Sequence, residues 1–178
     1  MSAIANHPDR PFELEDLLDA PDDGYRYEII DGALVLNPAP AWRHQRIIKN
    51  LLLVLSGAAP PEIEVLPAPV WHIGPGQIPE PDIVVVERSK LGDIAVEGTP
   101  LLVVEVLSPS NRGSDLVRKR ALYAEAGCPH YWIVDPTGPT VTVLTLIGGT
   151  YSETASVAGQ EHLRVEVPFP ISLHPGIL

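Results

Sequence analysis

Apolar and polar residues alternate along the chain with two different periods, which separate the expected strands from the expected helices. Residues 25–36 alternate with a period of two around Asp31 and Gly32, a pair typical of a two-residue β-hairpin turn. Residues 42–55 and 114–126 instead carry apolar side chains at helical spacing. The sequence therefore predicts a hairpin near the N-terminus and two amphipathic helices after it.

Two other segments, residues 82–87 and 101–107, are almost continuously aliphatic, which is typical of strands buried on both faces of a sheet. Residues 131–135 form another apolar run after the second predicted helix, and a strand–helix–strand unit of this length predicts a parallel, right-handed connection. Three further elements are expected, a short acidic helix, a proline-interrupted edge strand and a second hairpin, at residues 12–18, 64–73 and 140–151. We expect one α/β domain over residues 1–178.

Two carboxylates interrupt these apolar strands. Glu105 lies inside the run 101–107, where a buried charge is costly unless it is paired or bound to a metal ion. Asp82 opens the neighbouring run. A structural salt bridge at Glu105 and a strand-starting role for Asp82 are the plainer explanations of each residue alone. Together, two acids on adjacent buried strands favour a site for a hard cation such as Mg²⁺, which binds carboxylates, water and phosphate.

The second predicted helix carries a lysine on its apolar side. Lys119 shares one arc with Leu122 and Ala126, so we expect it to point inward, near the strand end that carries Glu105. The alternative is a surface ion pair between Lys119 and Asp115, four residues apart, worth about 0.3–0.5 kcal/mol.

The net charge of −11 is unfavourable for binding nucleic acid, because phosphates require positive potential. Seven of the 12 Lys and Arg residues lie in residues 43–49 and 112–120, where they form either two solvated helix faces or a binding surface. The single cysteine, Cys128, excludes an intrachain disulfide and leaves the redox compartment open, so we expect the default, a reducing cytoplasm. We expect no signal peptide and no membrane span.

Several short motifs follow one another in a fixed order along the chain. They are Tyr27-Glu28-Ile29-Ile30-Asp31-Gly32, His44, Pro81-Asp82-Ile83-Val84-Val85, Val104-Glu105-Val106-Leu107-Ser108-Pro109-Ser110, Asp115, Lys119, Tyr123 and Tyr131-Trp132-Ile133-Val134-Asp135-Pro136. In this order they resemble the Uma-type family, whose members are assigned as restriction endonucleases of the PD-(D/E)XK superfamily. The resemblance extends over about residues 12–175, which is most of the chain.

The resemblance implies a restriction-endonuclease-like core, a mixed β-sheet flanked by helices with an N-terminal β-hairpin. It also implies that Asp82 and Glu105 are metal ligands. The superfamily's signature lysine would stand two residues after the glutamate, but this chain has Leu107 there. The resemblance places that lysine on the following helix, at Lys119.

Two further residues enter the expected site through the resemblance. Glu28 corresponds to an additional acid near the site, and His44 to a histidine on the preceding helix. The resemblance leaves their individual roles open, as it does those of Asp115 and Tyr123.

Three functions remain compatible with the sequence. The first is an endonuclease that uses Mg²⁺ or Mn²⁺ held by Asp82 and Glu105, with Lys119 orienting the attacking water or neutralising charge that develops on the phosphate. It would bind DNA weakly and act as a homodimer, because two strands need two sites and a partner could cover exposed hairpin edges. The second is a catalytically inactive nucleic-acid-binding or assembly module, and the third a hydrolase of another phosphate-containing or small substrate.

Overall fold

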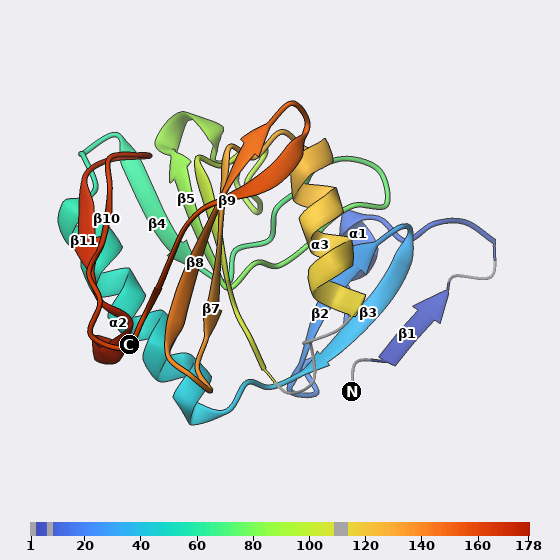
Figure 1. Cartoon of the computed structure of the whole chain (residues 1–178). Helices are drawn as coiled ribbons and strands as arrows, with labels where there is room; N and C mark the ends of the chain where they lie inside the picture. The colour runs from blue at the N-terminus through green and yellow to red at the C-terminus, as the bar shows by residue number, and fades with distance from the viewer. Residues whose placement is uncertain (1–2, 7–8, 109–113) are drawn as a thin grey trace.

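A mixed β-sheet forms the centre of the computed structural model, which describes residues 3–6, 9–108 and 114–178 and confirms the predicted α/β class (Figure 1). Within these residues the sheet has six strands, Ile63–Pro67 (β4), Ile83–Glu87 (β5), Leu102–Val106 (β6), His130–Asp135 (β7), Thr140–Ile147 (β8) and Thr150–Ala158 (β9), in that order. Strands β6 and β7 are parallel, as predicted, and the other neighbours are antiparallel.

The two acids that the sequence singles out lie at the central strands, Glu105 in β6 and Asp82 directly before β5. The apolar side chains of these strands are fully buried, as the continuous aliphatic runs predict. Ile83 pairs with Val104 in antiparallel register, so extending the register by one residue sets Asp82 opposite Glu105. Residues directly opposite one another in an antiparallel pair project from the same face. The two carboxylates therefore start from one face, at one end of the strand pair.

Two helices, Trp42–Ala58 (α2) and Ser114–Glu125 (α3), lie on opposite sides of the sheet (Figure 1). Helix α2 packs Leu51 and Leu55 into one half of the core, because its apolar residues recur at helical spacing. Helix α3 buries Leu122 and Tyr123 in the other half, and the Tyr123 ring meets that of Tyr131 edge-on at 5.4 Å.

The predicted hairpin forms a small sheet of its own with a strand from the N-terminal segment. Its strands are Tyr25–Ile30 (β2) and Ala33–Pro38 (β3), and Ala3–Asn6 (β1) pairs with the outer edge of β3. Ile29 on β2 exchanges backbone hydrogen bonds of 3.0 and 2.7 Å with Ile78. Both edges of this hairpin therefore have partners within the chain, so the suggestion that a second copy could cover them is wrong for residues 25–36; it remains a prediction for residues 140–151.

The turn of this hairpin matches its sequence. Asp31 and Gly32 have φ values of 52° and 73°, as a type I′ turn requires. A Cβ atom on Gly32 would stand 2.8 Å from Cβ of Pro11, so the position excludes a side chain on steric as well as backbone grounds.

Other elements differ from expectation in their lengths. The edge strand predicted over residues 64–73 ends at Pro67, where Ala68 takes a φ of 46° and the chain leaves the sheet. The acidic helix is Leu14–Leu18 (α1). Four short elements were not predicted, because segments of three residues carry no periodic pattern: Arg88–Lys90 (η1), Leu163–Val165 (β10), Ile171–Leu173 (β11) and Pro175–Ile177 (η2). No helix in the described parts of the chain is both long and apolar enough to cross a membrane.

Cys128 lies between α3 and β7 and is fully buried. Its Sγ is 3.3 Å from the carbonyl oxygen of His130, to which the thiol donates. Burial raises the pKa of the thiol to about 11. The group is therefore protonated and shielded from reagents in the folded protein.

Candidate active site

A cavity of about 590 Å³ opens at the end of the β5–β6 pair, between the first hairpin, the start of α2 and helix α3. All five side chains that the sequence singles out line it: Glu28, His44, Asp82, Glu105 and Lys119. Apart from the lysine, these are the polar or charged residues that the structure buries within the part of the chain it describes. Residues from five separate segments thus converge on one cavity, and Glu28, Asp82 and Glu105 are each only 3% exposed.

Asp82 is held from three sides just before β5. Its Oδ2 accepts hydrogen bonds from the backbone N–H of Val106 at 2.8 Å and from Nε2 of His44 at 3.0 Å. Its Oδ1 lies 3.2 Å from Nη1 of Arg26. Nε2 of His44 also lies 3.1 Å from the carbonyl oxygen of Val106, so two acceptors face this nitrogen and it carries the hydrogen. The start of α2 therefore fixes the orientation of Asp82.

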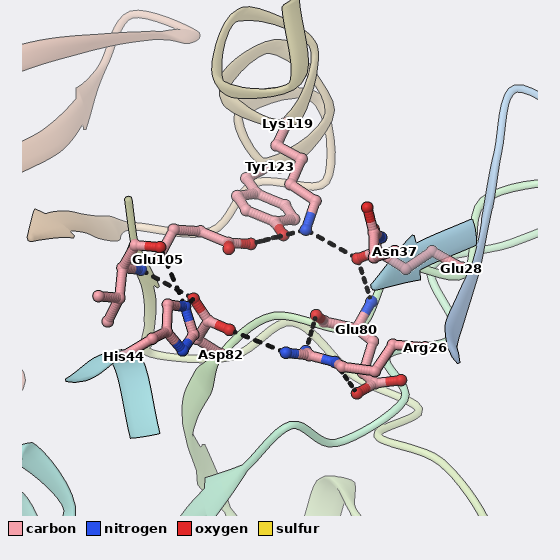
Figure 2. Close-up of polar contacts among 10 residues, drawn as sticks. Arg26, Glu28, Asn37, His44, Glu80, Asp82, Glu105, Lys119 and Tyr123 are labelled. Carbon is pink, nitrogen blue, oxygen red and sulfur yellow. Dashed lines mark hydrogen bonds and ion pairs between the residues drawn. The ribbon is translucent and has the colours of Figure 1, made fainter. Parts of the chain in front are cut away.

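Lys119 connects the acid of the sheet to the acid of the hairpin. Its Nζ lies 3.0 Å from Oε1 of Glu105 and 2.7 Å from Oε1 of Glu28 (Figure 2). One helical turn later, the hydroxyl of Tyr123 donates to the same Oε1 of Glu105 at 2.7 Å. Residues four apart lie on one helix face, so α3 presents both groups together. Lys119 thus points inward, as predicted; the side chain of Asp115, its alternative partner, lies outside the described residues.

Three residues that the sequence did not single out complete the polar network. Glu28 accepts hydrogen bonds from Nδ2 of Asn37 at 2.9 Å and from the backbone N–H of Glu80 at 2.8 Å. Nε of Arg26 lies 2.7 Å from Oε1 of Glu80. Two signals were available: Arg26 stands two residues before Glu28, hence on the same face of β2, and Asn37 pairs with Arg26 across the hairpin. Glu80 gave no signal, because it lies in a loop.

Burial and charge act on the site's titratable groups in different ways. Burial, aided by the negative charges of Asp82 and Glu28 and opposed by Lys119, raises the pKa of Glu105 to about 7. Burial would also raise the pKa of Asp82, but the hydrogen bond and charge of His44 and the charge of Arg26 hold it below its ordinary value.

The lysine responds in the opposite sense. Burial alone would lower the pKa of Lys119, but the carboxylates of Glu105 and Glu28 outweigh burial and raise it. The ammonium group therefore stays protonated at neutral pH. It can donate hydrogen bonds and offset negative charge, but it cannot serve as a general base.

The donor set at the cavity fits a divalent cation. Arg26 and Lys119 form ion pairs with four carboxylates, those of Glu28, Glu80, Asp82 and Glu105, and a bound dication would offset the excess of negative charge in this network. Oε2 of Glu105 accepts no hydrogen bond from the described residues. Nowhere in residues 9–108 or 116–178 do three acid, histidine or cysteine side chains enclose a metal position by themselves. Mg²⁺ suits such a site, because it binds one or two carboxylates together with waters and substrate phosphate.

Comparison with known proteins places the chain in a family. The fold resembles the crystal structure of a protein described as "a putative nuclease belonging to DUF820" from Anabaena variabilis, with a TM-score of 0.69 and 22% sequence identity over 89% of this chain and 90% of that chain. This similarity confirms the predicted fold. No curated protein matches the chain. The model of the Uma2 family, described as "Putative restriction endonuclease", matches residues 14–175. The chain therefore belongs to the Uma2 family.

Proposed function

We propose that this chain is a metal-dependent endonuclease that hydrolyses DNA phosphodiester bonds, with Asp82 and Glu105 as the ligands of Mg²⁺ or Mn²⁺. The observation that carries the proposal is the pair of buried carboxylates on adjacent strands, facing one cavity with a protonated lysine beside them. Two acids and a lysine at the end of a sheet are the groups that metal-assisted phosphodiester hydrolysis requires.

When bound, the cation would polarise a phosphate oxygen and lower the pKa of a water molecule. Lys119 would donate a hydrogen bond to the phosphate or to the attacking water, and its positive charge would stabilise the negative charge that develops on the phosphate oxygens. Glu28 and Glu105 hold the ammonium group in place from opposite sides. Because Asn37 and the backbone of Glu80 fix Glu28 in turn, the lysine is positioned before the substrate arrives.

His44 and Tyr123 act as positioning residues in this proposal. His44 donates to Oδ2 of Asp82, and Oδ1 points toward Arg26. A cation could bind Oδ1 once the contact between Arg26 and Oδ1 is broken. Tyr123 donates to Oε1 of Glu105, which leaves Oε2 for the cation.

The proposal also includes the partners expected from the sequence. We expect weak DNA binding, because the net charge is −11. The reducing cytoplasm is the expected compartment, since the one cysteine is buried and free. A homodimer remains our expectation for the assembled form.

Cleavage assays test the proposal. Wild type, Asp82→Asn, Glu105→Gln and Lys119→Met are incubated with supercoiled plasmid and with circular single-stranded DNA, in Mg²⁺, Mn²⁺ or EDTA. We expect cleavage by wild type in either metal, none in EDTA, and at least about a 100-fold loss in each variant. The matched control is Glu87→Gln on the same strand β5, whose carboxylate pairs with Lys90 outside the cavity and whose activity should be unchanged.

One observation favours a second function, a catalytically inactive nucleic-acid-binding module. Each acid of the network already has a cationic partner without any metal, because Lys119 bridges Glu28 and Glu105 and Arg26 contacts Glu80 and Asp82. DNA binding by wild type without cleavage in either metal, together with no binding of Mn²⁺ by calorimetry, would support this module and reject the nuclease.

A further inference from the structure

An exposed tryptophan lies at the edge of the cavity, between Ala41 and Arg43, which line it, although its own ring does not. Trp42 is the first residue of α2, two positions before His44, and it is 66% exposed. The other two tryptophans, Trp71 and Trp132, are 1% and 0% exposed. An indole this exposed gains little from folding, whereas a large rigid ring at the mouth of a site offers a surface for stacking.

Two arginines accompany this ring. The guanidinium carbon of Arg43 lies 5.3 Å from the centroid of the Trp42 ring, and that of Arg46 lies 5.8 Å from it. Both distances are typical of cation–π contacts. Even so, two thirds of the tryptophan side chain stays open to solvent. The rim therefore presents positive charge and a free aromatic surface side by side.

Arg43 brings an unneutralised charge to this rim. Its side chain lines the main cavity and also a smaller adjoining one of about 70 Å³. No carboxylate among the described residues forms an ion pair with it, in contrast to Arg26, whose guanidinium contacts Glu80 and Asp82. In a chain of net charge −11 with acids at the floor of the cavity, such a cation is the group that can attract a phosphate toward the site.

The acids of the cavity lie below the protein surface. Glu28, Asp82 and Glu105 are 3% exposed, and the segments Pro38–Ala41 and Pro136–Thr137 also line the cavity. In a duplex the faces of the bases are stacked on their neighbours and unavailable to an indole. An unpaired base has a free face, and its phosphate can reach toward the buried acids.

We propose that Trp42 and Arg43 form a subsite that stacks on an unpaired base and binds its phosphate, so that the substrate is single-stranded DNA or an unpaired stretch within a duplex. This inference rests on the proposed nuclease function and names its substrate class. Trp42 supplies the stacking surface and Arg43 the charge, and the strand then runs past His44 to the acids at the floor.

Trp42 itself provides the measurement, because the other two tryptophans are buried. A single-stranded oligonucleotide and the duplex of the same sequence are titrated in EDTA, where no cleavage occurs, and tryptophan fluorescence is followed. We expect the single strand to quench the emission and to bind more tightly than the duplex. Trp42→Ala should weaken single-strand binding by about 5- to 150-fold, the effect of losing one stacked base, and Trp42→Phe should retain most of the affinity.

A second variant tests the phosphate contact. Arg43→Ala should weaken binding and lower the slope of log affinity against log salt by about 0.7, the value for one phosphate of a single strand. The matched control is Leu53→Ala, because Leu53 is 69% exposed on the same helix but lies away from the cavity. Its affinity should equal that of wild type. Thermal melts check that every variant is folded.

The outcomes separate this inference from the nuclease proposal. Unchanged single-strand binding by Trp42→Ala, or tighter binding of the duplex, overturns the subsite even if wild type cleaves DNA. Tight, Trp42-dependent binding of single strands by a protein that cleaves nothing supports the subsite and rejects the nuclease. Absence of any DNA binding overturns the subsite.

Discussion

Glu105 shows how one buried residue couples stability to pH. Lys119 and Tyr123 share its Oε1, and burial is the main reason that its pKa rises from 4.5 to about 7. A folded-state pKa above the unfolded value means that the native state holds the proton more tightly. The resulting stabilisation is fully present below about pH 4.5 and is lost as the pH rises through 7. Without metal, the ionised Glu105 therefore lowers the free energy of unfolding at pH 8.

We predict that Glu105→Gln is as stable as wild type or more stable in EDTA at pH 8, by up to about 3 kcal/mol. The amide avoids the cost of burying a charge, and Lys119 keeps Glu28 at 2.7 Å as its partner. The variant should also lose much of the pH dependence of stability between pH 5 and pH 8. Thermal melts at several pH values measure both effects.

Glu87→Gln is the control, because this acid is outside the cavity. A Glu105→Gln protein that melts well below wild type in EDTA, equivalent to roughly 3–5 kcal/mol, would instead make Glu105 half of a structural salt bridge.

Single residues could be identified from the sequence where their chemistry conflicts with their surroundings. Asp82 and Glu105 stand out because charges are rare in aliphatic strands, and Lys119 because it lies on an apolar helix face. Arg26 and Asn37 stand out only once Glu28 is assigned to the site, because Arg26 shares its face of β2 and Asn37 pairs with Arg26; otherwise polar residues on a hairpin are indistinguishable from solvated ones. Glu28 and His44 were identified only through the family resemblance.

At the scale of elements, the first hairpin and α3 form one clamp around the cavity. Nε of Arg118 on α3 lies 2.8 Å from Oδ2 of Asp31 in the hairpin turn, and its Nη2 donates to the carbonyl oxygen of Ile30 at 3.0 Å. The turn that positions Glu28 is thus fastened to the helix that carries Lys119. Conformational strain in this turn should therefore displace Glu28 and Lys119 in the cavity.

We predict that Gly32→Ala destabilises the protein by about 1–3 kcal/mol and lowers DNA cleavage. Gly32 has a φ of 73°, and an added Cβ would meet Pro11 at 2.8 Å. Gly57→Ala is the matched control, because Gly57 lies in helix α2 and an added Cβ would have no atom within 4 Å. This variant should be more stable than wild type by about 0.5–1 kcal/mol. Chemical denaturation gives both values. A Gly32→Ala protein as stable as wild type contradicts the prediction.

The elements that the sequence predicts are those with a long, regular pattern. Strands β5, β6 and β7 are continuous apolar runs, and α2 has four helical turns of apolar spacing. Strands β10 and β11 have three residues each, so periodicity cannot distinguish them from loops. The pairing of β1 with β3 joins distant segments, and local pattern does not reveal such a contact.

At the scale of the whole molecule, the edge strand β9 is the feature that bears on assembly. No strand within the described residues pairs with its outer side, and Thr150–Ala158 contains one charged residue, Glu153, with no lysine or proline. Protein sheets usually protect such edges. The other edge strand, β4, contains Glu64 and Pro67, so we expect a second copy of this chain to add its sheet at β9.

We predict a homodimer through β9 at micromolar concentration, measured by light scattering. Ser156→Lys places a charge on this exposed edge and should shift the protein toward monomer. Ser56→Lys adds the same charge at an exposed position of α2 and should leave the dimer intact. A wild-type monomer under these conditions contradicts the prediction.

The buried thiol makes the opening of the fold around it measurable by chemical labelling. Cys128 lies between the end of α3 and the start of β7. A thiol reagent can therefore reach its sulfur only after α3 separates from the sheet. With no second cysteine in the chain, every labelled molecule records one such opening. The labelling rate therefore reports how often α3, and Lys119 with it, lifts from the sheet. A ligand that contacts both β6 and α3 at the cavity should lower the labelling rate of Cys128 as its occupancy rises. Its binding can then be measured without observing catalysis.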